Sequence, residues 1–140
     1  MELPSKKVLT LELAKRIAGV CTEYAHQRGF AIDLAIVDAG GHLVYFERED
    51  GVSVGTVQVA IMKAQSSAVF RRPSKQFEIS VNEGLIGMVA LPGMAPFEGA
   101  VPIAVQGDVI GAVAVSGVTK EIDGEIAQAG ADAVAGILAE

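Results

Sequence analysis

The amino-acid sequence predicts an α+β domain in which helices pack on an antiparallel sheet. Residues 31–47 and residues 100–115 each have the pattern of a local hairpin, and segments of helical periodicity flank both. The order is therefore helix, hairpin, helix, loop, hairpin, helix. Strands that pair with their neighbours along the chain form antiparallel sheets, whereas βαβ units form parallel ones. With 51% hydrophobic residues, residues 1–140 are expected to form one domain with its own core.

The first helix is expected from about Thr10 to Gln27. Apolar residues recur at helical spacing after Thr10, whose hydroxyl suits an N-cap, and Gly29 suits a stop. The single cysteine, Cys21, lies within this apolar stripe. We interpret it as a small buried residue and not as a nucleophile, because no pattern of catalytic partners accompanies it.

Both hairpins follow from the spacing of their side chains. Residues 31–38 alternate, and a glycine-containing turn leads to a second strand at about residues 43–47. The later strands, residues 100–105 and 109–115, are apolar on both faces, so they are expected to be buried on both sides or to lie in an oligomer interface. Gly111 interrupts the last strand, which predicts a close approach by another backbone.

The remaining elements surround these hairpins. Helices are expected at Val54–Phe70, with Ser53 as its cap, and from Thr119 to near the end of the chain. A short helix or turn is expected at Ser74–Val81. The segment after it is rich in glycine and methionine, and we expect one short strand there, at Gly87–Leu91, inside a loop.

Charge and composition exclude several classes of partner. The net charge is −6 and the isoelectric point is about 4.9, which argues against nucleic acid and against an anionic membrane surface. A single cysteine cannot form an intrachain disulfide. The N-terminus lacks the apolar core of a signal peptide, and no apolar run reaches the roughly 18 residues that cross a bilayer. A cytoplasmic location is therefore expected.

Three longer stretches carry a resemblance to a known family. They are VDAGGHLVYFEREDG (37–51), KAQSSAVFRRPS (63–74) and GAVPIAVQGDVIGAVAVSG (99–117), followed by an acidic start to a helix rich in alanine and glycine. In this order the chain resembles the GlcG/HbpS-like family, which includes the C-terminal domain of PduO-type proteins, over about residues 5–138. The resemblance implies a profilin-like fold with a five-stranded antiparallel sheet, residues 87–91 being the fifth strand. It also implies a homo-oligomer, and haem as a cofactor, since several members bind it.

His26 and His42 are the two histidines and the candidate iron ligands. Histidine is a common axial ligand of haem iron. His26 lies near the end of the first helix, where the helix dipole also favours an ordinary surface histidine. His42 lies in the first hairpin turn, at a position where the family commonly has histidine. The alternative is a turn residue that faces solvent.

A set of charged residues follows the second strand and lines the second helix. Arg48, Asp50 and Lys63 match the Arg-x-Asp-Gly and Lys-Ala positions of the family, and Arg48 and Lys63 are expected to bind the carboxylates of a ligand. The alternative is that either pairs with Asp50. Glu98 or Asp50 is the candidate general base if its surroundings raise its pKa. Otherwise Glu98 is an exposed loop acid.

Four further residues are expected to line the ligand site. Gly99 permits close approach, Ser116 places a hydroxyl at the end of the last strand, and Met94 and Phe97 form an apolar wall. Met94 and Phe97 also suit ordinary packing.

Three functions are open from the sequence. The first is a homo-oligomeric protein that binds haem or a related flat molecule with carboxylates. The second is an enzyme that acts on a small organic acid or aromatic metabolite by proton transfer. The third is an accessory subunit without a ligand.

Overall fold

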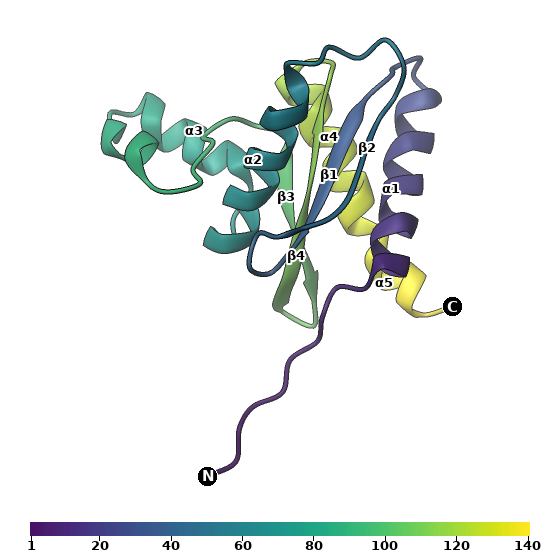
Figure 1. Ribbon diagram of the computed structural model, residues 1–140, viewed down its shortest axis with the longest axis vertical. Helices are drawn as coiled ribbons and strands as arrows, with labels where there is room; N and C mark the ends of the chain where they lie inside the picture. Colours follow the sequence, from purple (N-terminus) through teal and green to yellow (C-terminus); the bar gives the residue numbers. More distant parts are fainter.

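The computed structural model describes residues 1–140. Its helices are α1 (Leu11–His26), α2 (Thr56–Phe70), α3 (Ser74–Asn82), the 3-10 helix η1 (Ile86–Ala90), α4 (Lys120–Asp132) and α5 (Val134–Leu138). Its strands are β1 (Asp33–Asp38), β2 (Leu43–Arg48), β3 (Ala100–Val105) and β4 (Asp108–Ser116). The sheet forms a central layer, with α1 and α4 packed on one face and α2 on the other (Figure 1). None of these helices combines the length and the hydropathy that crossing a bilayer requires.

The four strands are antiparallel and lie in the order β2-β1-β4-β3. The predicted α+β class with an antiparallel sheet is therefore confirmed. The hairpin predicted at residues 100–115 supplies one inner strand, β4, and one edge strand, β3. β4 is buried on both sides because helices cover both faces of the sheet, which accounts for its lack of a polar face.

The expected fifth strand is absent. Residues 86–90 form η1, which is closed by local bonds from the N–H of Met88 to the Leu85 carbonyl (3.2 Å) and from the N–H of Leu91 to the Met88 carbonyl (3.1 Å). The chain reaches this segment through α3, which leads away from the sheet, so that α3 and η1 form an arm beside α2 (Figure 1). Because no strand edge lies beside this segment, its backbone N–H and C=O groups form hydrogen bonds with each other. The prediction of five strands was wrong.

The two faces of the sheet are packed with side chains of different size. The face toward α1 and α4 holds the larger aliphatic residues, such as Ile36, Ile103 and Val113. The face toward α2 is built almost wholly of alanine and valine. Because the distance between packed elements depends on the side chains between them, the alanines let α2 lie close to the strands. A long polar side chain on this side of α2 therefore reaches the backbone of the sheet.

Three local predictions have different outcomes. A Cβ on Gly111 would collide with the carbonyl oxygen of Val37 on the adjacent strand, so the predicted backbone approach is confirmed. Thr10 caps α1, and its Oγ1 accepts a backbone N–H at 3.1 Å. Ser53 does not cap α2. The chain makes an extra turn there, Gly55 occupies the N-cap position, and Ser53 Oγ accepts the N–H of Gly55 at 3.4 Å.

Cys21 is wholly buried between α1 and α4, as its place in the apolar stripe predicts. Burial raises the pKa of its thiol to about 12, so the thiol stays protonated and unreactive at neutral pH. A Cβ on Gly130 would collide with the Cys21 sulfur. Gly130 therefore lets α4 approach α1 at this point.

Candidate functional site

Three polar side chains form a row across the sheet where β1 begins. Asp33 is paired with Arg48 on β2 and with Ser116 on β4. Directly opposed residues of antiparallel strands project to the same face, and alternation along β1 places this row on the side of α2. Thr56, the first residue of α2, donates its hydroxyl to Asp33 Oδ2 at 2.7 Å. The row is thus held between the sheet and the start of α2.

Lys63 extends from α2 into the same region and is wholly buried. Its Nζ donates to the backbone carbonyl of Val115 at 2.7 Å and to that of Glu98 at 3.2 Å. Burial lowers the pKa of Lys63, and the nearby charges of Asp123 and Asp33 oppose this effect only in part. At a given pH, a larger fraction of this amine is therefore neutral than for a surface lysine.

Two carboxyl groups near Lys63 are also shifted by burial. Burial raises the pKa of Asp123 to about 6, against the attraction of Lys63 and the N–H of Val118, which donates to Asp123 Oδ1 at 3.1 Å. Burial likewise raises the pKa of Asp33, against its hydrogen bond from Thr56. Groups shifted in this way by burial beside a specific charge are typical of functional sites.

Two buried atoms of the row have no hydrogen-bond partner. They are Asp33 Oδ1 and Ser116 Oγ, and their side chains are 0% and 2% exposed. Leaving a buried polar atom unpaired costs about 1–3 kcal/mol. Such atoms in a folded protein require an explanation, and a bound polar molecule is one.

Lys63 is covered on its solvent side by the segment Phe97–Gly99. The centroid of the Phe97 ring lies 5.8 Å from Lys63 Nζ, and the ring is about half exposed. A Cβ on Gly99 would collide with the Lys63 amine, and Gly99 has a φ of +135°. Only glycine therefore suits this position, because it leaves space for the amine and adopts this conformation without strain.

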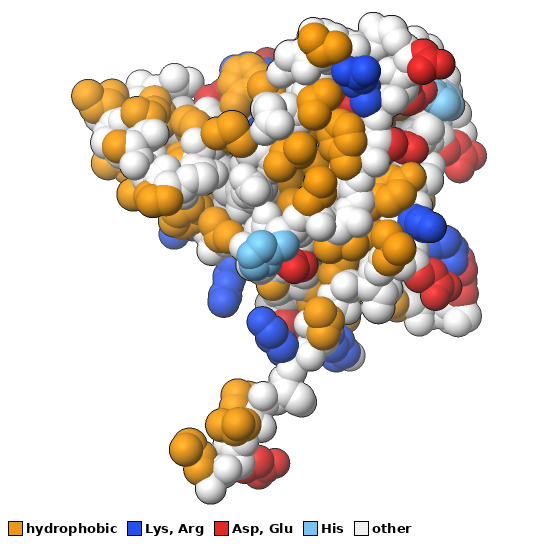
Figure 2. Space-filling view, in the orientation of Figure 1, with side chains coloured by type: hydrophobic (Ala, Val, Ile, Leu, Met, Phe, Trp, Pro, Cys, Tyr) orange, Lys and Arg blue, Asp and Glu red, His pale blue; other side chains and the backbone are white.

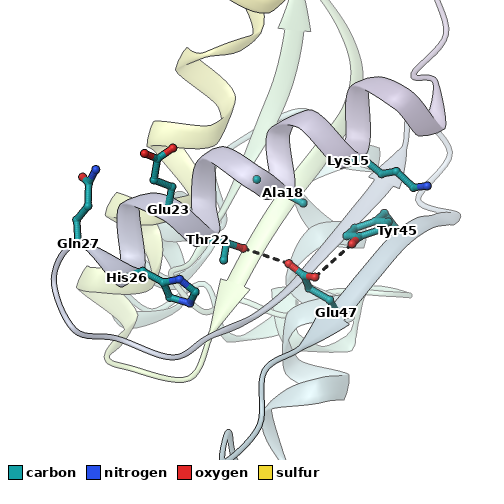
Figure 3. A pocket seen from close by; sticks show the side chains of 9 residues that line it. Lys15, Ala18, Thr22, Glu23, His26, Gln27, Tyr45 and Glu47 are labelled. Carbon is teal, nitrogen blue, oxygen red and sulfur yellow. Dashed lines mark hydrogen bonds between the residues drawn. The ribbon is translucent and has the colours of Figure 1, made fainter.

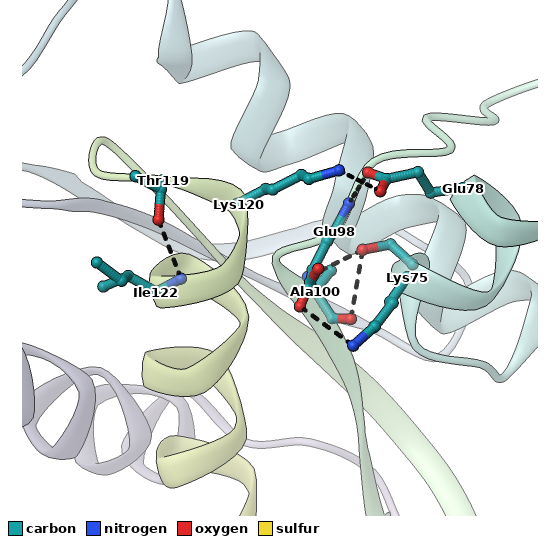
Figure 4. Close-up of polar contacts among 8 residues, drawn as sticks. Lys75, Glu78, Glu98, Ala100, Thr119, Lys120 and Ile122 are labelled. Carbon is teal, nitrogen blue, oxygen red and sulfur yellow. Dashed lines mark hydrogen bonds and ion pairs between the residues drawn. The ribbon is translucent and has the colours of Figure 1, made fainter. Parts of the chain in front are cut away.

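Glu98 lies within a network of ion pairs on the outside of this segment (Figure 4). Its carboxylate lies 4.0 Å from Lys75 Nζ, and its backbone N–H donates to Glu78 Oε1 at 3.0 Å. Glu78 in turn pairs with Lys120 at 2.6 Å. The two lysines next to the cover are therefore both paired with acids.

The structure brings five of the expected site residues together, and these are Lys63, Glu98, Gly99, Ser116 and Phe97. Arg48 lies at one end of the row, beside Asp33. Asp50 is exposed in the loop after β2. Met94 is buried in a loop tied to α2 by Ser66, whose Oγ accepts the N–H of Ala95 at 2.7 Å. Both histidines lie elsewhere.

Sequence reasoning missed Asp33 and Asp123 as members of this cluster. Asp33 opens β1 and is followed by four apolar residues, and a carboxylate at the start of a buried run is a signal that points to a paired or functional acid. Asp123 resembles an ordinary acid of a first helical turn, where it suits the helix dipole. No sequence signal distinguishes it from its exposed neighbour Glu121.

His26 borders a polar hollow of about 470 Å³ between α1 and β2 (Figure 3). Its Nε2 is engaged by Glu49 Oε2 at 2.6 Å. Glu47 projects into the hollow and accepts the hydroxyls of Thr22 at 3.1 Å and Tyr45 at 3.2 Å. The hollow has more acidic than basic side chains and few apolar ones.

His42 lies beside a second hollow, of about 350 Å³, at the other end of the sheet. Its ring packs against Gly40, a lining residue, since a Cβ there would lie 3.0 Å from the ring. Three cations line this hollow: Lys6, Lys7 and Arg71. Figure 2 shows basic side chains gathered at the root of the N-terminal segment.

His42 Nδ1 lies 3.3 Å from Asp38 Oδ1, and the imidazole is largely exposed. Asp38 Oδ1 also accepts the N–H groups of Gly40 at 2.9 Å and His42 at 3.0 Å, which holds the turn. This contact occupies one ring nitrogen and leaves Nε2 free.

Comparison with known proteins identifies the family. A family model described as haem degrading protein HbpS-like matches residues 9–132. The chain belongs to the HbpS-like family. It is also 34% identical to the protein GlcG of Escherichia coli K12 over 114 residues, which are 81% of this chain and 85% of GlcG. The resemblance stated from the sequence motifs is thereby confirmed.

Solved structures of similar proteins share the fold. The ORFY protein of Klebsiella pneumoniae matches with a TM-score of 0.88 and 28% identity, over 96% of this chain and 97% of ORFY. A double mutant of HbpS from Streptomyces reticuli matches with a TM-score of 0.86 and 25% identity, over 93% of this chain and 89% of HbpS.

Proposed function

We propose that this HbpS-like protein binds haem, or a related flat molecule with carboxylates, in the hollow beside His42. The description of its family as haem degrading supports this class of ligand. The observation that carries the choice of site is a hollow lined by three cations and by Gly40, against which the His42 ring packs with one ring nitrogen free. The second function open from the sequence is a proton-transfer enzyme. Its candidate general bases, Glu98 and Asp50, do not line either of the two hollows described above.

The residues of this hollow suit a haem in charge. Lys6, Lys7 and Arg71 outnumber the single acid Asp108 and would pair with the two propionates, and Ala39 and Val109 offer apolar wall. A bound haem would supply an iron that an imidazole nitrogen is able to hold. His42 would offer Nε2, while Asp38 holds Nδ1, the usual arrangement in which a carboxylate orients a metal-binding histidine.

The hollow beside His26 fits such a ligand poorly. Glu23 and Glu47 line it against the single cation Lys15, and Glu49 engages the histidine. A dicarboxylate would meet net repulsion there. Exposed ion pairs contribute about 0.5 kcal/mol each, so three cations against the one acid Asp108 favour an anion in the hollow beside His42 by roughly 1 kcal/mol, about fivefold in affinity.

The test is a titration of the purified protein with hemin, followed by its visible spectrum. We expect a saturable band that is lost in His42→Ala and kept in His26→Ala. The double change Lys6→Gln and Lys7→Gln should weaken binding about fivefold, since two exposed ion pairs contribute roughly 1 kcal/mol. A flat response, or a band that persists in both histidine variants, contradicts the proposal.

We also propose that the protein is a homo-oligomer whose subunits meet on the outer side of α2 and on the arm. The charged residue of α2 is Lys63, which is buried, so the exposed side of the helix is uncharged. Large hydrophobic side chains are exposed along both elements (Figure 2), and these are Val59, Met62, Val69, Phe70, Ile79, Leu85, Ile86 and Val89.

The apolar surface of these eight side chains suits a protein interface. Each is about half exposed, so together they expose on the order of 400 Å², taking about 100 Å² for a whole apolar side chain. That approaches the apolar part of an interface of about 800 Å² per partner. Since the chain carries a net charge of −6, an uncharged surface is also where two copies repel each other least.

Sedimentation equilibrium tests this assembly. Met62→Glu is expected to lower the mass toward that of one chain, while Leu11→Glu, an exposed hydrophobic position on α1, leaves it unchanged. A wild-type protein that sediments as one chain contradicts the assembly, and an oligomer that resists Met62→Glu contradicts the surface.

A further inference from the structure

The cluster around Lys63 has the parts of a covalent site, and none of them is used by the hollow at His42. Lys63 lies seven residues before Phe70, the last residue of α2, which is about 10 Å along the helix axis, and Arg71 follows the helix. We propose that Lys63 is the nucleophile of an imine-forming site for small uncharged aldehydes, and that Asp33 and Ser116 hold the aldehyde oxygen.

The surroundings of the Lys63 amine suit a nucleophile. Its two hydrogen bonds go to backbone carbonyls and not to a carboxylate, so no ion pair at contact distance holds it as an ammonium. An ammonium has three donors, and these two bonds use two of them. Burial also lowers its pKa, which is how desolvation activates lysine in proteins that form imines.

The two unpartnered atoms suit the oxygen of the substrate. The Lys63 amine contacts the Val115 carbonyl, and Ser116 follows directly on the same strand. The Ser116 hydroxyl is able to donate to an aldehyde oxygen, and Asp33 Oδ1 is able to accept from the hydroxyl that this oxygen becomes. One small molecule thus pairs both atoms, whose burial otherwise has a cost.

The charges of the cluster select an uncharged substrate. Four acids act on Lys63: Asp123, Asp33, Glu98 and Glu78. The nearby cations Lys75 and Lys120 lie with Glu98 and Glu78 (Figure 4). A carboxylate substrate therefore meets repulsion at the cover, where both cations are paired with acids. Arg48, the remaining cation of the row, is exposed at the end beside Asp33. The tight packing of α2 on the sheet restricts the aldehyde to a few carbons.

The covering segment is the route of entry. Phe97, about half exposed, and the Glu98 carbonyl lie between the amine and solvent. The segment from Pro92 to Gly99 contains no helix or strand, so its displacement breaks few backbone hydrogen bonds. Such displacement exposes the amine without unfolding the sheet.

The reaction balances without an oxidant or reductant. The nitrogen lone pair of Lys63 forms a bond to the aldehyde carbon, and the oxygen takes a proton from the Asp123 carboxyl. The nitrogen then returns one proton to the Asp123 carboxylate. The hydroxyl then takes the proton from the Asp123 carboxyl and leaves as water, while the nitrogen lone pair forms the C=N bond. The second proton of the nitrogen passes to the Asp123 carboxylate. The sum is amine plus aldehyde giving imine plus water.

The experiment traps the imine in the whole protein. Wild type is treated with propanal and sodium cyanoborohydride at neutral pH, and propylated lysines are identified by peptide mass spectrometry. We expect Lys63 to be labelled faster than the exposed Lys15 and Lys75, although it is buried. Labelling of Lys63 no faster than of those lysines, or only after denaturation, overturns the proposal.

Variants separate chemistry from simple exposure. Asp123→Asn keeps an acceptor for the Val118 N–H and is expected to slow Lys63 labelling about 100-fold, the lower end of the effect of a positioned proton donor. Ser116→Ala is expected to slow it as well, and Lys15→Arg, at an exposed position on α1, is the control that leaves it unchanged. The wild-type rate requires a protonated Asp123 and a neutral Lys63, so above about pH 6 the loss of the Asp123 proton offsets the gain in free amine and the rate should level off. In Asp123→Asn the rate should keep rising with pH as the amine loses its proton. Equal rates in Asp123→Asn and wild type contradict the mechanism, while hemin binding at His42 remains an independent readout.

Discussion

Replacing Asp123 by Asn is expected to stabilise the protein at neutral pH. Asp123 is 5% exposed and faces Lys63, while Asp33 and Glu121 add negative charge to its surroundings. Burial raises its pKa from 3.8 to about 6, so the folded protein binds this proton more tightly than the unfolded chain does. This contribution favours folding below pH 4 and is lost as the pH rises through about 6.

The magnitude follows from the size of the shift. One pKa unit corresponds to 1.36 kcal/mol, so a shift of about two units corresponds to roughly 3 kcal/mol. Above pH 7 the ionised wild-type side chain carries this penalty in the folded state, whereas Asn has no charge. Asn also retains the oxygen that accepts the N–H of Val118. Asp123→Asn should therefore unfold with a free energy about 3 kcal/mol higher at pH 8.

Urea unfolding followed by circular dichroism measures this difference across pH. The gain should be full at pH 8, shrink between pH 6 and pH 4, and vanish below pH 4. Glu121→Gln, an exposed acid in the same helical turn, is the matched control and should change stability little. A variant that is less stable than wild type at pH 8, or a gain that does not depend on pH, refutes the reasoning.

The remaining predictions concern glycine, cysteine and a helix cap. Gly99→Ala should lower the free energy of thermal unfolding by more than 2 kcal/mol, about the sum of backbone strain and overpacking against Lys63. Gly84→Ala should cost less, because φ is positive there too but an added Cβ would have no atom within 4 Å. Equal losses would contradict the role of the contact with Lys63. Cys21 should resist iodoacetamide in the folded protein and react only as it unfolds, because its thiol is buried and has a pKa of about 12; rapid alkylation of native protein would disprove this. Thr10→Ala should lower stability by about 1 kcal/mol through loss of the α1 cap, and Thr10→Ser should restore it.

The predictions from local pattern mostly hold. The hairpin strands, the helix beginning after Thr10 and the burial of Cys21 follow from spacing and capping, which depend on near neighbours in the chain. The strand expected at residues 87–91 was wrong because an apolar run has no intrinsic partner, and α3 carries this one away from the sheet. Ser53 was a wrong cap for a similar reason, since one extra turn moves the start of a helix.

The candidate site was only partly predictable. Lys63, Glu98 and Ser116 were named from the sequence, but as separate candidates on three segments. That their groups meet depends on the register of β1 with β4, which also brings in Asp33, and on the close packing of α2. Asp123 belongs to α4, 60 residues after Lys63, and no local sequence pattern predicts that the two groups lie close together.

The sequence by itself determined the class of fold, the family and the order of elements, because the periodicity of apolar side chains and the ordered motifs are properties of the chain. Only the tertiary structure decided that Lys63 is buried with two unpartnered polar atoms nearby, and that the cations of the N-terminal segment line the hollow beside His42 and not the one beside His26. The physical reason is that burial and charge depend on what surrounds a group in space. Those surroundings, in this protein, come from segments up to 90 residues apart, such as Asp33 and Asp123.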